Sequence, residues 1–222
     1  MNRMFFPRIS PLVILLILLI PLLLVFFLVN AINTAFMKLG FSPWLAFGIL
    51  FASLIGSRIN FPITKGERKV EKGHGSSLFF GRAESLSTVQ ETVIAVNLGG
   101  AIIPLLVSLY LLANSNVPIW KVLIGIVAVT AACYRFARPV PKVGIGLPLF
   151  MPPIMSAAVA MVLSHAYAPV IAYVSGVLGV LIGADLLNLP KIANLGAPMA
   201  SIGGAGTFDG IFLTGVISVL LV

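Results

Sequence analysis

Charged residues are scarce in this sequence. Asp, Glu, Lys and Arg make up only 9% of its 222 residues, whereas 59% are hydrophobic. A soluble domain carries about 25% charged residues, so this chain has too few to cover a surface that faces water. The composition therefore excludes an ordinary soluble fold and predicts that the lipid bilayer is the main partner of the chain.

The residue types that commonly bind metals are also few. A single cysteine, Cys133, excludes an intrachain disulfide and any site built from several cysteines. The two histidines, His74 and His165, fall on opposite sides of the predicted membrane, so they cannot ligate one ion. The segment Gly204-Ala205-Gly206 does not follow a predicted strand, so a phosphate-binding loop is not expected. We therefore expect no metal and no cofactor.

The apolar residues form long blocks, and they do not alternate with polar residues as they do in the strands of a barrel. Helices satisfy their own backbone hydrogen bonds in lipid, and about 20 mostly apolar residues cross it. The sequence therefore predicts an all-α fold: a polytopic transmembrane helical bundle of about seven spans, in a single domain that covers residues 1–222. The predicted spans are Pro11–Val29, Pro43–Ile59, Thr92–Ala113, Val117–Ala137, Leu147–Ser164, Ala168–Leu187 and Pro198–Val222.

Basic residues mark one side of the predicted membrane. Twelve of the fourteen Lys and Arg fall in the amino-terminal tail or in the loops after the second, fourth and sixth spans, including the long loop at 60–91. Only Lys38 and Lys121 fall on the other side. Because basic residues favour the cytoplasmic side, the pattern predicts a cytoplasmic amino terminus, a cytoplasmic 60–91 loop and an outside carboxyl terminus. We therefore expect a multi-pass protein of a prokaryotic plasma membrane.

Two alternative interpretations of the basic residues are less favoured. A net charge of +8 would suggest nucleic acid in a soluble protein, but here anionic lipid accounts for it, so no nucleic-acid partner is expected. Arg3 and Arg8 before the first apolar block could begin a signal peptide. The block is long and no Ala-x-Ala site follows it, which favours a retained anchor.

Two aspartates lie inside predicted spans. The glutamates all fall in or beside the 60–91 loop, whereas Asp185 and Asp209 fall in the sixth and seventh spans. An ionisable group is costly in lipid, so its default interpretation is functional. A rise of about 1.5 Å per residue puts both aspartates at similar depth in the cytoplasmic half of consecutive antiparallel helices. The two carboxyls can then share one proton, so that one activates a water and the other donates to a carbonyl oxygen.

Small and polar residues accompany both aspartates. Five glycines fall within residues 196–210, and glycine permits close backbone approach or a broken helix. We expect Asn188 and Pro190 to end the sixth helix, and Asn97 to contribute from a third span that Gly99 and Gly100 interrupt. The predicted supporting residues are Gly183, Asn188, Gly206, Thr207, Gly210 and Asn97.

Residues 168–222 resemble the presenilin and signal-peptide-peptidase class of intramembrane aspartyl proteases. The shared features are two consecutive spans with one aspartate each, a cytoplasmic connection and glycines before the second aspartate. That class uses Tyr-Asp and Gly-x-Gly-Asp motifs, whereas Ala184 precedes Asp185 and Phe208 precedes Asp209 here. The resemblance implies that Asp185 and Asp209 are the catalytic residues of an endopeptidase that acts on a membrane-protein or peptide substrate. The whole chain also resembles an uncharacterised family of prokaryotic membrane proteins of unknown function, which implies architecture but no activity.

Two other functions fit the same residues. Broken helices with intramembrane acids also form the sites of ion- or proton-coupled transporters and channels, and Asn97 and Asn188 would then be neutral partners. A structural membrane subunit would instead use its Gly and Ala content for close helix packing. In that case Asp185 would form an ion pair with Lys191 or Arg135. The distance between the two carboxyls separates a shared role from two independent ones.

Overall fold

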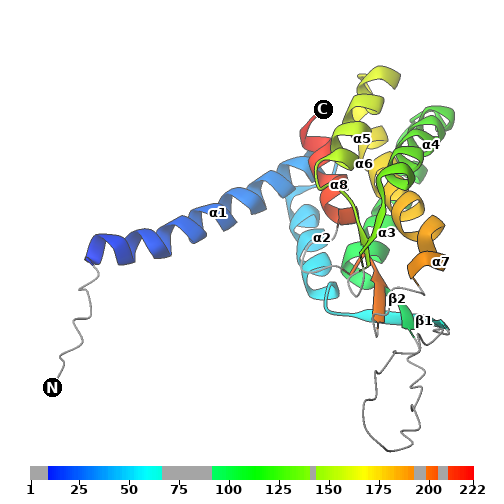
Figure 1. Cartoon of the computed structure of the whole chain (residues 1–222). Helices are drawn as coiled ribbons and strands as arrows, with labels where there is room; N and C mark the ends of the chain where they lie inside the picture. The colour runs from blue at the N-terminus through cyan, green and yellow to red at the C-terminus, as the bar shows by residue number, and fades with distance from the viewer. Residues whose placement is uncertain (1–9, 67–91, 141–143, 193–198, 205–209) are drawn as a thin grey trace, which may run out of the picture.

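The computed structural model describes residues 10–66, 92–140, 144–192, 199–204 and 210–222, and most of them are helical. Figure 1 shows the helices and the long amino-terminal helix α1 that extends away from the others. The α-helices are α1 (Pro11–Lys38), α2 (Pro43–Gly56), α3 (Ile103–Asn114), α4 (Ile119–Phe136), α5 (Met151–Leu163), α6 (Ala168–Val180), α7 (Leu189–Ile192) and α8 (Gly210–Leu220).

Within the described part of the chain, three helical stretches are long and apolar enough to cross a membrane. They are Leu15–Lys38, Ile119–Phe136 and Ala168–Lys191, and the last of these joins α6 to α7 through two irregular turns. The remaining apolar helices have between 10 and 17 residues, which is shorter than the about 20 residues that cross lipid alone. The expectation of apolar helices is therefore confirmed. The stretch that joins α6 to α7 reaches Lys191, directly after Pro190, which is close to where Asn188 and Pro190 were expected to end the sixth helix.

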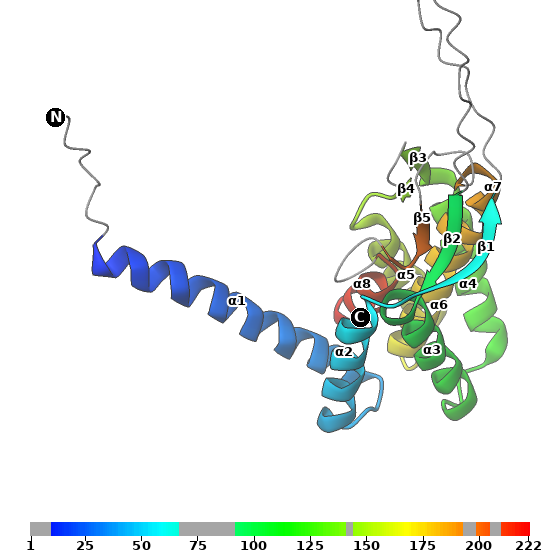
Figure 2. The ribbon, with the colours of Figure 1, turned by 90° about the horizontal axis from the view of Figure 1, so that it is seen from below.

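Short strands correct the prediction of an all-α fold. Strand β1 (Asn60–Gly66) pairs antiparallel with β2 (Thr92–Asn97), which pairs in parallel with β5 (Met199–Ile202). Figure 2 shows β2 between β1 and β5. A second pair joins β3 (Arg138–Val140) to β4 (Gly144–Gly146).

The predicted third and seventh spans therefore begin as strands, because hydropathy alone cannot separate a short buried strand from a helix. The predicted 60–91 loop likewise begins with β1, and residues 67–91 lie outside the described part of the chain.

Helix α6 is the centre of the bundle. It packs against α4, α5 and α8, and almost all of its residues are buried. Its contact with α4 is close because two glycines face that helix. A Cβ atom on Gly179 would lie 2.5 Å from Val129 Cγ1, and one on Gly183 would lie 2.4 Å from the Thr130 carbonyl oxygen. Small residues at one-turn spacing are how membrane helices approach each other closely.

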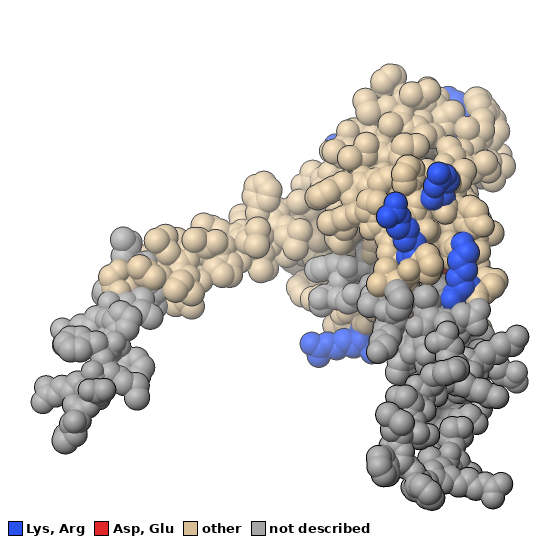
Figure 3. All heavy atoms as spheres, in the orientation of Figure 1, with Lys and Arg blue, Asp and Glu red and all other residues tan. Residues whose placement is uncertain are grey.

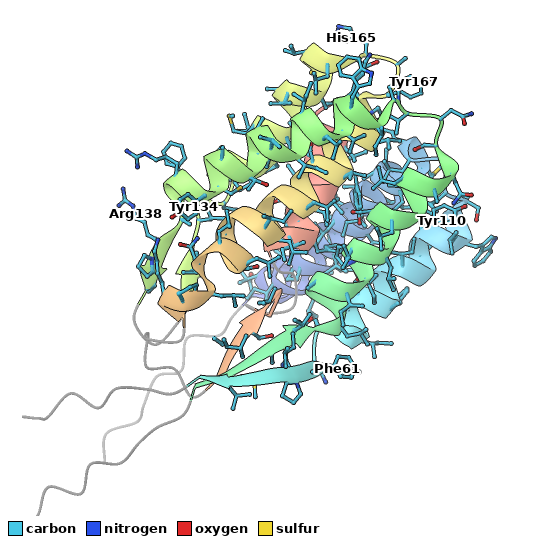
Figure 4. All side chains as sticks on the ribbon, turned by 90° about the vertical axis from the view of Figure 1, so that its right-hand side faces the viewer. Phe61, Tyr110, Tyr134, Arg138, His165 and Tyr167 are labelled. Atoms are coloured by element: carbon cyan, nitrogen blue, oxygen red, sulfur yellow. The ribbon has the colours of Figure 1, made fainter. Side chains whose placement is uncertain are left out.

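The two ends of the bundle differ in charge. Figure 4 places Tyr134 and Arg138 at one end and His165 and Tyr167 at the other. We call the first the basic end, because α2, α4 and α7 finish there beside Arg58, Arg135, Arg138 and Lys191. Figure 3 shows several Lys and Arg side chains gathered near the lower part of the helical body. At the opposite end Lys38 donates to the Val222 carbonyl oxygen at 2.8 Å.

The close α4–α6 contact predicts that Gly183→Ala destabilises the fold. The added methyl would overlap the α4 backbone, and overpacking of this kind costs about 1–3 kcal/mol. The measurement is the thermal unfolding midpoint of the purified chain in detergent. Gly48→Ala is the control, because a Cβ there meets nothing within 4 Å. Equal midpoints for the two variants would contradict the packing described here.

Candidate functional site

A cavity of about 320 Å³ lies at the basic end of the bundle. It is enclosed by the segment that follows β4, by the irregular end of α6 and by the first turns of α8. Its lining residues are Ile145, Gly146, Leu147, Pro148, Leu149, Pro152, Val180, Ala184, Asp185, Gly210, Leu213 and Thr214. Three helices therefore contribute to one cavity, and most of its wall is apolar.

Asp185 is the acidic residue that lines this cavity. It is half-buried, and it is the only acidic side chain among the described residues. It closes a π-helical turn, η2 (Leu181–Asp185), which is followed by a 3₁₀ turn, η3 (Leu186–Asn188). Such irregular turns inside a helix occur frequently at functional sites. The break leaves the Asp185 carboxyl at the cavity wall.

The second predicted aspartate cannot be placed. Asp209, Gly206 and Thr207 all lie outside the described residues, so the distance between the two carboxyls stays open. Gly210, the next residue after Asp209, begins α8 and lines the same cavity as Asp185. A Cβ atom on Gly210 would meet nothing within 4 Å, so the cavity is open at this point.

Asn188 supports the broken segment that carries Asp185. Its side-chain nitrogen donates to the Gly183 and Ala184 carbonyl oxygens, each at 3.0 Å, and its side-chain oxygen accepts from Lys191 Nζ at 2.8 Å. Lys191 Nζ also lies 5.2 Å from the centre of the Tyr134 ring. The asparagine is 1% exposed, so its bonds to the two carbonyl oxygens are shielded from water. It holds the backbone around Asp185 rather than lining the cavity.

Asn97 lies elsewhere. Its side-chain nitrogen donates to the Ser57 carbonyl oxygen at 2.7 Å and to Asn60 Oδ1 at 3.0 Å. Its side-chain oxygen accepts from the Gly100 backbone nitrogen at 2.8 Å and so begins a π-helical turn, η1 (Leu98–Ile102). Asn97 joins the end of α2 to the sheet and does not line the Asp185 cavity, so its predicted place in the same site is wrong.

Several lining residues were not predicted from the sequence. Thr214 lies one turn after Gly210 in α8, and helical spacing could have identified it. No sequence pattern predicted the β3–β4 hairpin, although the segment after it forms one wall of the Asp185 cavity. Pro148 and Pro152 line the cavity near the start of α5.

A second cavity, also of about 320 Å³, carries no polar side chain. It lies between the sheet, η1 and the end of α6, and its lining residues are Ile63, Ile94, Val96, Ala101, Ile102, Leu105, Leu181, Leu186, Leu189 and Ile202. Among the residues that the structure describes, no three His, Cys, Asp or Glu side chains come together as metal ligands. The Asp185 cavity is therefore the stronger candidate site.

The bonds of Asn188 predict that Asn188→Ala destabilises the chain. The substitution removes the side-chain donor to the buried Gly183 and Ala184 carbonyls, and a buried polar group without a partner costs about 1–3 kcal/mol. Thermal unfolding in detergent measures the effect. Asn114→Ala is the control, because Asn114 is exposed and its side chain donates to the Tyr110 carbonyl oxygen in its own helix. A loss no greater than in the control would refute this role.

Comparisons with known proteins give one match. No curated protein and no solved structure matches the chain, so the comparisons provide no link to the intramembrane aspartyl proteases. A family model described as "Protein of unknown function (DUF1614)" matches residues 54–221, which include every residue that lines the Asp185 cavity. The expected resemblance to a family of unknown function is thus confirmed, and the chain belongs to the DUF1614 family.

Proposed function

We propose that the chain is a multi-pass protein of the cell membrane with seven spans, a cytoplasmic amino terminus and an outside carboxyl terminus. The support is the unequal charge of the two ends. Arg58, Arg135, Arg138 and Lys191 lie at one end of the bundle, and basic residues favour the cytoplasmic side. The Asp185 cavity then faces the cytoplasm, because it lies at the basic end of the bundle. One of its walls comes directly after the β3–β4 hairpin, and another comes directly before α7.

Reporter fusions test this orientation. Alkaline phosphatase fused after Val222 is expected to be active, because it would lie outside the cytoplasm, where its disulfides form. The same enzyme fused to a chain that ends at Lys191 is expected to be inactive, while a green fluorescent protein there is bright. The opposite pair of results would reverse the orientation.

We propose further that Asp185 and Asp209 form the site of an ion- or proton-coupled transporter. The main support is the position of Asp185. It lies where a membrane-length helix is broken, and it lines a cavity to which α5, α6 and α8 contribute. Discontinuous helices with an intramembrane acid are characteristic of transport sites. The α8 helix contributes to this pattern, since it begins at Gly210 beside the same cavity.

Flux through liposomes tests the transport proposal. The purified chain is reconstituted, and a sodium or proton gradient is imposed. Asp185→Asn and Asp209→Asn are each expected to lower the flux to that of empty liposomes, because each removes a charge from the path. Glu71→Gln is the matched acid-to-amide control in the loop, and it is expected to keep the flux. Full flux in either aspartate variant would reject the proposal.

Intramembrane hydrolysis is a second candidate, and one observation favours it. Gly210, which follows Asp209 in the sequence, lines the cavity of Asp185. The cavity of about 320 Å³ has room for about ten waters at about 30 Å³ each. One carboxylate would activate such a water while the protonated partner donates to the peptide carbonyl.

A membrane-span reporter separates the two activities. Cleavage that Asp185→Asn and Asp209→Asn both abolish, in a chain that shows no ion flux, would favour the hydrolase. Flux without cleavage would favour the transporter. A folded chain in which both substitutions leave every readout unchanged would indicate a structural subunit.

A further inference from the structure

The second cavity, with its apolar lining, lies beside the same irregular segment that carries Asp185. Leu181 of η2, Leu186 of η3 and Leu189 of α7 line it from this segment, and the sheet and η1 form its other walls. Among the described residues, none lines both cavities. The broken end of α6 therefore contributes to one cavity that contains an acid and to another that presents apolar side chains.

This apolar cavity is open to the surface. Of its lining side chains, Ile63 is 65% exposed and Leu186 is 42% exposed. Ile94 and Ile202 also line it, but they are only 7% and 5% exposed, so they form its inner wall. The volume of about 320 Å³ falls within the range of about 300–1,000 Å³ for small-molecule sites. Because apolar cavities stay dry and take apolar molecules, we expect a hydrocarbon group as the occupant.

Basic side chains lie at the same end of the bundle as this cavity. Arg58 comes two residues before β1, and Lys191 follows the lining residue Leu189 by two positions in α7. Both basic side chains are exposed. The Lys191 ammonium has three hydrogens. It donates to Asn188 Oδ1 at 2.8 Å, and its Nζ lies 5.2 Å from the centre of the Tyr134 ring. Lys, Arg and Tyr at one level are typical of the lipid headgroup region.

A peptide strand is a poorer occupant of this cavity. It would extend the sheet along β1, which is an edge strand of the described sheet. Pro62 has no backbone N–H to donate, and the register of β1 shifts between Pro62 and Thr64. Proline and bulges in an edge strand hinder pairing with another chain. A lipid tail needs no backbone hydrogen bond, so these features do not hinder it.

We propose that the apolar cavity binds one acyl chain of an anionic phospholipid, whose phosphate is held by Lys191 at the basic end. The chain packs against the leucines of η2, η3 and α7, and it supports the broken segment that carries Asp185. That the lipid belongs to the cytoplasmic leaflet rests on the proposed orientation, and any effect on flux rests on the proposed transport. Binding of the lipid rests on neither.

Photocrosslinking tests whether an acyl chain enters the cavity. The full-length chain is reconstituted in phosphatidylethanolamine vesicles with a trace of phosphatidylglycerol that carries a photoreactive diazirine in one acyl chain. Mass spectrometry after illumination is expected to find adducts on Ile94 and Ile202, which are too buried to meet bulk lipid. Val122 and Val129 are the controls without adducts, because they are 0% exposed and line neither cavity. A lack of adducts on both isoleucines would overturn the proposal.

Filling the cavity tests the same site by substitution. Leu105→Trp is expected to lower the adducts on Ile94 and Ile202 several-fold, because Leu105 lines the cavity. Leu106→Trp is the matched control, since Leu106 is the next residue of α3, is 57% exposed and does not line the cavity. Ile102→Phe is a second filling variant, and the unfolding midpoint in detergent shows which variants fold. Unchanged adducts in a folded filling variant would contradict the assignment.

A change of headgroup tests the role of Lys191. A phosphatidylcholine probe with the same photoreactive chain is expected to give several-fold fewer adducts on Ile94 and Ile202. Lys191→Gln is expected to lower the phosphatidylglycerol adducts to that level, whereas Lys121→Gln, at the other end of α4, keeps the difference. Equal adducts from both lipids, or a difference that Lys191→Gln retains, would overturn the proposal. These readouts measure no flux, so lipid binding and transport can fail independently.

Discussion

Every backbone polar group in a lipid-facing bundle needs a partner inside the protein, and the candidate site depends on how this chain meets that requirement. At the irregular turns that end α6, the buried side chain of Asn188 donates to the carbonyls of Gly183 and Ala184. The break can then persist without exposing backbone to lipid. Asn97 does the equivalent at the start of η1, where it binds the Gly100 nitrogen. Two buried asparagines thus permit the two irregular turns around which the cavities form.

Two faces of helix α6 contact different helices and pack against them in different ways. Gly179 and Gly183 face α4 so closely that no side chain fits, which fixes the position of the helix. Gly176 and Ser175 face α5 and α8, where glycine allows a close approach and serine supplies hydrogen bonds. Rigid packing on one face allows the other to keep a cavity and these buried hydrogen bonds. A bundle held only by interlocking apolar side chains would fill such a space, because interiors pack densely.

The sequence predicts the helices and the charge asymmetry well, because both follow from local composition. Apolar blocks identify α1, α4 and α6, and the excess of Lys and Arg identifies the basic end. The strand β2 was missed because Thr92–Asn97 is a short run of β-branched and apolar residues whose hydropathy equals that of a helix. The cavity was found only in part. Asp185 and Gly210 carry local signals, but the wall after β4 depends on tertiary placement, and Asn97 belongs to a different junction.

The acid and the bases at the same end of the bundle differ in their exposure to water. Arg135, Arg138 and Lys191 are exposed, and salt screens such charges beyond about 8 Å. Asp185 is half-buried on a largely apolar cavity wall, where an electrostatic interaction is several-fold stronger than in water. In the proposed transporter the exposed bases would face anionic lipid, whereas the half-buried carboxylate would interact strongly with a small cation in the cavity. A positive protein surface and the proposed cation-binding cavity are thus compatible, since screening weakens the exposed charges over distance.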